Sequence, residues 1–187
     1  MSDTTPGSTP GTTPGTTADA TEATARALAQ RFVRDEAGFA QLTTLDARGY
    51  PVTRTMTAFL LDEWSVATVQ RRGHRRIEQW RRRPQTEVTW VGSPRPGATN
   101  ERPHVFDLGR LPPRVVAVRG EAVLMPPGWT EQVYRAAVTA QRARGNTRAP
   151  LRSPEEVAAD LVGVLIRPVR VRLEGFGDGA QSFTFVP

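Results

Sequence analysis

The sequence of 187 residues contains no cysteine, no lysine, only two histidines and no long uninterrupted run of apolar residues. Without cysteine the chain can form neither a disulfide nor a thiolate metal site, and it has no cysteine nucleophile. His74 and His104 supply the only imidazoles, so we expect neither a zinc site nor a histidine-centred triad. No membrane-length apolar stretch and no signal-peptide pattern is present, so we expect a cytoplasmic protein.

Positive charge is in excess, and one short segment accounts for it. The formal net charge is +6, and all 25 basic residues are arginine. Between residues 71 and 83 the one acidic residue is Glu78, and the arginines are Arg71, Arg72, Arg75, Arg76, Arg81, Arg82 and Arg83. A solvated helix face, a cofactor phosphate site and a nucleic-acid surface all fit such a cluster. The charge alone therefore leaves three interpretations open.

The chain divides into a tail and one domain. Residues 4–15 repeat a Thr-Pro-Gly pattern without large apolar side chains, which cannot offset the entropy of ordering. We predict that residues 1–17 are disordered and that residues 18–187 form one domain, which is an ordinary domain size.

Apolar periodicity predicts a mainly β domain. Strands are expected over 39–45, 51–61, 64–69, 86–91, 114–125, 161–173 and 182–186. Helices are expected over 18–37, 74–83 and 129–144, with another short one capped by Ser153. Residues 93–112 form a long connection rich in proline and glycine, and Gly120 is expected to produce a β-bulge. Hairpin-linked strands with helices inserted at two points favour an antiparallel barrel of six to seven strands with peripheral helices.

Several short motifs occur in an order that resembles the pyridoxamine 5′-phosphate oxidase-like family of FMN-binding split β-barrels. The residues that carry the resemblance, over about residues 22–175, are Thr44, Asp46, Gly49, Pro51, Arg54, Thr68, Arg76, Trp80, Pro84, Gly120, Ala122 and Pro168. Two departures are evident. Arg75 or Arg76 stands where the family commonly has lysine, and the C-terminal segment that contacts pyridoxamine phosphate is missing. Oxidation of vitamin B6 is therefore not expected.

The resemblance implies an oxidoreductase that binds FMN at a homodimer interface and transfers hydride to or from a small molecule. It implies that the phosphate is held by Arg54, Thr68, Arg75 and Arg76, with Gln70 beside them. The isoalloxazine would lie against the strand at Thr55, Met56 and Thr57. No catalytic acid or base is evident. The deazaflavin cofactor F420 is an alternative to FMN, and a non-enzymatic flavin-fold or nucleic-acid-binding module is an alternative of another class.

Overall fold

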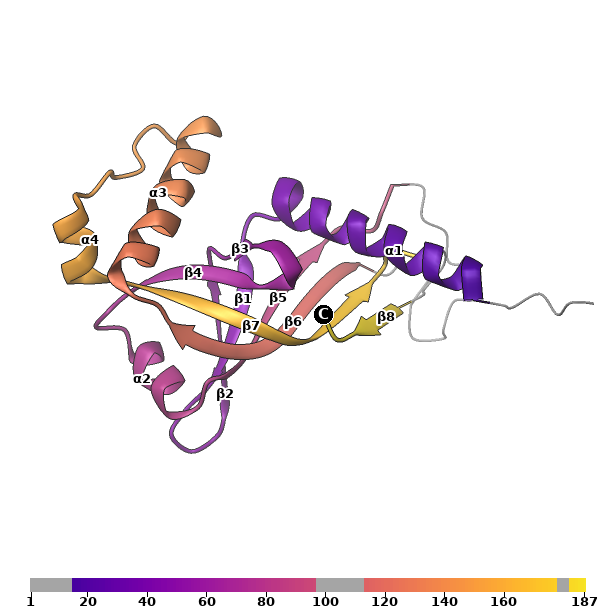
Figure 1. The fold of residues 1–187 in the computed structure, drawn as a ribbon, viewed down its shortest axis with the longest axis horizontal. Helices are drawn as coiled ribbons and strands as arrows, with labels where there is room; N and C mark the ends of the chain where they lie inside the picture. The colour runs from indigo at the N-terminus through magenta and orange to yellow at the C-terminus, as the bar shows by residue number, and fades with distance from the viewer. Residues whose placement is uncertain (1–14, 97–112, 178–181) are drawn as a thin grey trace, which may run out of the picture.

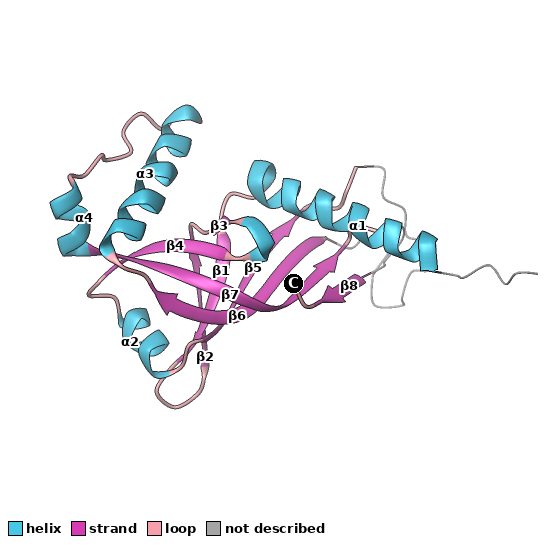
Figure 2. Cartoon of the chain, viewed as in Figure 1, coloured by secondary structure: helices cyan, strands magenta, loops and turns pink. Residues whose placement is uncertain are grey.

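The computed structural model describes residues 15–96, 113–177 and 182–187, of which residues 15–20 are described by their backbone alone. One curled antiparallel sheet forms the centre and helices lie at its periphery (Figures 1 and 2). The elements are α1 (Gly15–Arg31), the π-helical turn η1 (Phe32–Glu36), β1 (Ala40–Leu45), β2 (Pro51–Met56), β3 (Phe59–Leu60), the 3₁₀ turn η2 (Asp62–Trp64), β4 (Val66–Arg71), α2 (Arg75–Arg82), β5 (Gln85–Gly92), β6 (Arg114–Leu124), α3 (Pro127–Ala143), α4 (Pro154–Asp160), β7 (Leu161–Glu174) and β8 (Ser182–Phe185). The predicted mainly β fold with a split barrel is confirmed.

The sheet contains eight strands, one more than the largest number expected. The order is β2-β1-β5-β6-β7-β4-β3, and β8 pairs with β7. β2 and β3 are separated by two residues in the chain, Thr57 and Ala58, yet they lie at opposite ends of this order. The sheet must therefore curl until its two ends meet at Thr57 and Ala58, which closes one side of the barrel.

This closure corrects the prediction of one continuous strand over 51–61. The alternating pattern runs through residues 51–61 without a proline or glycine after Pro51, so nothing local marks the break. The break is set by long-range pairing, because β2 pairs with β1 whereas β3 pairs with β4. The predicted three-strand meander is accordingly wrong.

The core fills the inside of the curled sheet and the space beneath α1. Its largest fully buried side chains include Leu42, Trp90 and Ile166. Full burial of such a side chain stabilises the fold by about 1.5 to 3 kcal/mol. On the N-terminal helix, Ala29 and Phe32 face this core. The helix begins at Gly15 and not at residue 18, so residues 15–17, predicted as part of the disordered tail, are helical. Residues 1–14 of the predicted tail and residues 97–112 of the predicted connection lie outside the described residues.

The first turns of α3 pack on β7. Thr130 and Val138 are buried, whereas Ala136 is exposed. The Thr130 hydroxyl donates to the Pro126 carbonyl at 3.0 Å and accepts the Gly163 amide at 2.8 Å. The hydrogen bond between α3 and β7 thus sets the rotation of α3 about its axis. The apolar periodicity of the sequence gives no information on this bond.

Two predicted local features are confirmed. The pairing of β6 with β7 shifts register between Arg119 and Gly120, which is the expected bulge. A Cβ at Gly120 would lie 2.1 Å from the carbonyl oxygen of Arg167, so only glycine fits there. Ser153 caps α4 in a capping box, in which its hydroxyl accepts the Glu156 amide at 3.2 Å.

Within the described residues, no helix combines the length and the apolar content that a membrane span needs. The same residues contain no group of three or more histidine or acidic side chains placed to hold a metal ion.

Candidate functional site

Strand β2 presents Arg54 and Met56 to the inside of the curled sheet. Exposure alternates along the strand, so Arg54 is half-buried, Met56 is buried and Thr55 is exposed between them. The side chain of Thr55 therefore points away from the other predicted residues. At Thr55, only backbone atoms could contact a cofactor bound on the inner face of the sheet.

Arg54 is held by weak polar contacts. Its Nη1 lies 3.4 Å from the Thr44 hydroxyl and 3.4 Å from Oε1 of Gln79, while the Thr44 hydroxyl donates to the same Gln79 oxygen at 2.7 Å. Among the described residues no carboxylate forms an ion pair with Arg54. Most of the donors of this guanidinium therefore remain available for an anion.

A chain of three hydrogen bonds joins Arg76 to the end of β2. Arg76 Nη1 donates to Gln70 Oε1 at 2.7 Å, and Gln70 Nε2 donates to the Thr68 hydroxyl at 2.6 Å. The Thr68 hydroxyl donates in turn to the carbonyl oxygen of Thr57 at 2.9 Å. Thr68 and Gln70 are buried, so this chain fixes the direction of the half-buried Arg76 guanidinium.

Met56 lies beside the same chain, with its sulfur 3.5 Å from Gln70 Nε2 and 3.9 Å from Arg76 Nη1. The structure therefore brings together five of the eight predicted residues by direct contacts, namely Met56, Thr57, Thr68, Gln70 and Arg76. Their mutual contacts come from β2, β4 and α2, which the sheet curl places next to one another.

His74, which precedes α2, adds an unpaired polar group to this site. It occupies the N-cap position without making a side-chain cap, and its Nδ1 is buried with no partner among the described residues. Burial lowers the pKa of His74, and the positive charges of Arg76, Arg71 and Arg54 lower it further. Sequence reasoning missed His74 as part of the site and also missed Gln79, because neither belongs to a motif that marks it.

The electrostatic environment of the site is positive, and the part of the chain that the structure describes places no neutralising carboxylate there. The pKa of Arg76 falls below its ordinary value, first because the guanidinium is partly buried and then because Arg54 is close. No ion pair between Arg76 and an acidic side chain occurs in the described parts of the chain. Two neighbouring cations and the amino end of α2 therefore favour a bound anion.

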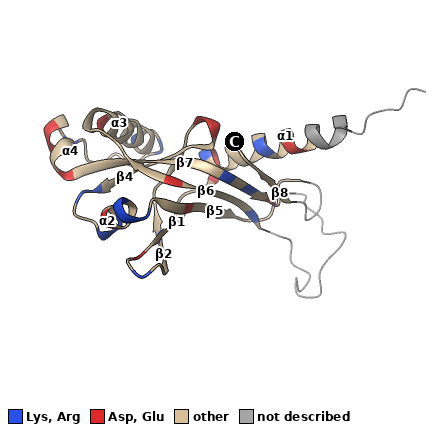
Figure 3. Cartoon of the chain, turned by 60° about the horizontal axis from the view of Figure 1, so that its bottom comes forward, with Lys and Arg blue, Asp and Glu red and all other residues tan. Residues whose placement is uncertain are grey.

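The other arginines of the 71–83 segment behave differently from Arg76. Arg75 is exposed and has no polar partner among the described side chains, and Arg81 pairs with Glu78. Arginines make up much of α2, which also carries Glu78 (Figure 3). The predicted pair Arg75 and Arg76 thus separates into an outward residue and an inward one.

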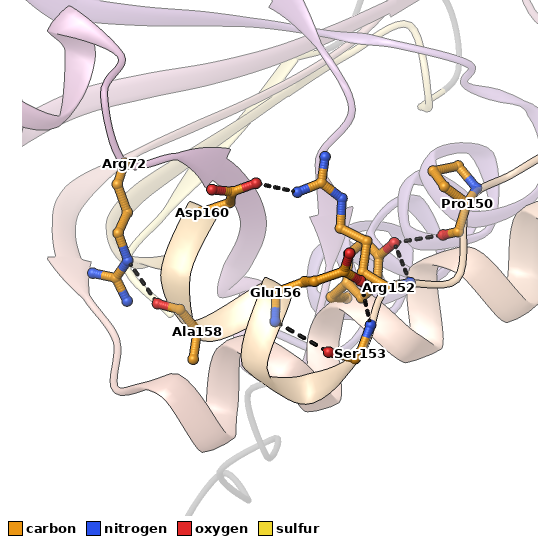
Figure 4. A network of polar contacts seen from close by, with 8 residues as sticks. Arg72, Pro150, Arg152, Ser153, Glu156, Ala158 and Asp160 are labelled. Atoms are coloured by element: carbon orange, nitrogen blue, oxygen red, sulfur yellow. Dashed lines mark hydrogen bonds and ion pairs between the residues drawn. The ribbon is translucent and has the colours of Figure 1, made fainter.

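The segment ahead of α2 is anchored on α4 (Figure 4). Arg72 Nε donates to the carbonyl oxygen of Ala158 at 3.1 Å, and the Arg72 amide donates to that of Asp160 at 2.9 Å. The Asp160 carboxylate also pairs with Arg152 at 2.7 Å. These contacts fix the start of α2, which carries His74 and Arg76.

No known family profile and no curated protein sequence matches this chain. Solved structures do resemble it. A protein named as a pyridoxamine 5′-phosphate oxidase from Listeria innocua superimposes with a TM-score of 0.52 and 19% identity, over 80% of this chain and 96% of that chain. General stress protein 26 from Bacillus anthracis gives 0.54 and 13% identity, over 84% and 97%. A heme-binding protein from Mycobacterium smegmatis gives 0.55 and 14% identity, over 84% and 56%. At these identities the likeness concerns the fold, which is the split barrel of the pyridoxamine 5′-phosphate oxidase-like proteins.

Proposed function

We propose that this chain binds FMN, with the cofactor phosphate between Arg54 and Arg76, and acts as an oxidoreductase on a small molecule. The observation that carries the proposal is a pair of half-buried arginines for which the described residues supply no carboxylate partner. One of the two, Arg76, is oriented by the hydrogen-bond chain from Thr57 through Thr68 and Gln70. A phosphate carries up to two negative charges and accepts the forked contacts that guanidinium groups offer.

One polar group beside the arginines is unpaired. Nδ1 of His74 has no partner among the described residues, and the charges of Arg76 and Arg54 act on this imidazole. Because Nδ1 is enclosed, a phosphate oxygen could reach it only if the side chain turns.

In the proposed reaction the protein binds and orients, and FMN when bound supplies the hydride chemistry. Arg54 and Arg76 hold the phosphate, and the strand at Thr55, Met56 and Thr57 positions the ring by its backbone. We assign no residue the role of acid or base.

F420 is the second candidate cofactor, and the exposed arginines favour it. Arg75, Arg82 and Arg83 are exposed on α2 and directly after it, so they could contact an acidic tail attached to the phosphate. A non-enzymatic module remains the alternative of another class. Nucleic-acid binding by this surface predicts an affinity that falls steeply with salt.

We further propose a homodimer with the cofactor at its interface, as the resemblance of the motifs to the pyridoxamine 5′-phosphate oxidase-like family implies. Light scattering on the purified protein tests this, and a monomer at micromolar concentration contradicts it.

The experiment for the cofactor is a titration of purified protein with FMN and with F420, followed by absorbance and fluorescence. The Arg76→Ala variant should lose about 10- to 100-fold in affinity for the true ligand, because a hydrogen bond to a charged group contributes about 1.5 to 3 kcal/mol. Arg82→Ala, on the same helix, is the matched control for FMN and should keep the FMN affinity, whereas a loss of F420 affinity in it would place the acidic tail of F420 beside Arg82. Arg75→Ala decides whether the outward arginine contributes. Failure to bind either cofactor, or binding of heme in their place, overturns the proposal.

A further inference from the structure

A groove lies between α3 and the inner end of the sheet, outside the arginine site. Two adjoining hollows of about 410 and 270 Å³ make up this groove. Both are lined by Thr57, Phe59, Ala137 and Gln141, so they lie side by side. The groove thus runs along α3 past the connection between β2 and β3.

The walls of the groove are apolar and leave room for a flat molecule. On the helix side Ala137 and Ala140 present only methyl groups. On the opposite side Ala58 and Phe59 line it, and Phe39 stands at the edge with 66% of its surface exposed. A large exposed aromatic next to small apolar residues is typical of a ligand groove.

No aspartate or glutamate lines either hollow among the described residues. Each arginine at its rim already has an acceptor. Arg34 pairs with Asp62 at 3.5 Å, Arg144 Nη2 donates to the Arg34 carbonyl at 2.6 Å, and Arg152 pairs with Asp160. A cation would find no acidic partner among the described residues of the groove, and the walls are mainly apolar, so an uncharged ligand fits this groove best.

One polar side chain in the wall is free to specify a ligand. Gln141 lines both hollows and is half-buried, and its side-chain amide has no hydrogen-bond partner in the described part of the chain. An amide offers both a donor and an acceptor. It therefore suits a hydroxyl or carbonyl group on an otherwise apolar ring.

The groove also touches the proposed cofactor strand. Thr57 lines both hollows, and its carbonyl oxygen is the end of the hydrogen-bond chain that aims Arg76. A ligand in the groove would lie beside the strand that would carry the flavin ring. That placement is what a substrate needs.

From these observations we infer that the groove binds an uncharged planar aromatic molecule with one hydroxyl or carbonyl group, which hydrogen-bonds to Gln141. The molecule is the substrate class of the proposed oxidoreductase. Its role as a substrate rests on the proposed function, whereas its binding does not.

The test is equilibrium dialysis of the full chain against 2-naphthol, with 2-naphthylmethylamine as the cationic analogue. The wild type should bind 2-naphthol saturably with a dissociation constant below about 0.1 mM and the cationic analogue at least tenfold more weakly. Ala140→Trp fills the groove from an exposed helix position and should weaken the binding of 2-naphthol at least tenfold. Thr139→Trp, at an exposed position of the same helix that lines neither hollow, should bind as the wild type does.

Two further measurements make the result specific. Gln141→Leu, which keeps the apolar bulk, should weaken 2-naphthol by about 3- to 10-fold through the lost hydrogen bond. FMN affinity, measured in parallel, should be unchanged in Ala140→Trp.

Three outcomes would overturn the inference. They are no saturable binding of 2-naphthol by the wild type, equal binding of 2-naphthol by Ala140→Trp, and competitive displacement of 2-naphthol by FMN. If the wild type binds 2-naphthol but not FMN, the proposed function is contradicted and the assignment of the groove is not.

Discussion

Replacing Thr68 by valine tests whether the buried hydrogen-bond chain supports both the fold and the site. Valine has nearly the same shape as threonine, so the substitution removes a hydroxyl and leaves no cavity. The Thr57 carbonyl then loses its side-chain donor, and Gln70 Nε2 loses an acceptor at 2.6 Å. Gln70 Nε2 keeps only the long contact to the Met56 sulfur.

The magnitude follows from the burial of both partners. Thr68 is fully buried and Gln70 is 6% exposed, so water cannot replace the lost partner easily. A buried polar group without a partner costs about 1 to 3 kcal/mol. With two such groups, one of them partly compensated, we expect Thr68→Val to lower the free energy of unfolding by about 2 to 4 kcal/mol. The melting temperature should fall by about 5 to 15 °C.

The assay is urea denaturation of the wild type, Thr68→Val and the control Thr68→Ser. Serine keeps the hydroxyl and loses one methyl, which should cost only about 1 kcal/mol. Since the hydroxyl also holds Gln70 against Arg76, FMN affinity should drop about tenfold in the valine variant and remain in the serine variant. A valine variant as stable as the serine variant would refute the reasoning.

Three other perturbations test separate parts of the structure. Gly120→Ala should prevent folding or lower the melting temperature strongly, since its Cβ would meet the Arg167 carbonyl oxygen at 2.1 Å; soluble yield and melting curves check this. Ser153→Ala should lower the free energy of unfolding by about 1 kcal/mol through loss of the capping box, as measured by urea denaturation. The lowered pKa of His74 means that the unfolded chain takes up a proton below about pH 6.5 while the folded chain resists it, so stability should fall as the pH drops below 6.5. In His74→Gln that part of the fall should be absent, and identical pH profiles for the two proteins would contradict the assignment.

The sequence predicts most strands and helices of this protein because local patterns determine them. The alternation of apolar and polar residues identifies β5, β6 and β7. The capping box of Ser153 is visible in the order Ser-Pro-Glu-Glu. A β-bulge at Gly120 is recognisable because glycine interrupts a strand that contains several valines. These features depend on neighbours along the chain and not on distant contacts.

The break at Thr57 and Ala58 depends on distant contacts and was not predictable from the pattern. Its cause is the closure of the curled sheet, which separates β2 from β3. The same closure brings Thr57 against Thr68 and so assembles the site. A pattern with a period of two gives no information on which strands pair.

The site was predicted in part for a similar reason. The shared order of motifs pointed to Arg54, Thr68 and Arg76, but it did not separate Arg76 from its neighbour Arg75. The rotation of α2 makes that distinction, because Ile77 and Trp80 are buried and turn Arg75 outward. His74 and Gln79 are ordinary polar residues in sequence and acquire their place only through packing.

The most direct measurement compares FMN with riboflavin, which has the same ring and lacks the phosphate. If Arg54 and Arg76 hold a phosphate, the wild type should bind FMN at least tenfold more tightly than riboflavin, and Arg76→Ala should reduce that ratio to near one. Equal affinity for the two ligands in the wild type, or an unchanged ratio in Arg76→Ala, would contradict the account.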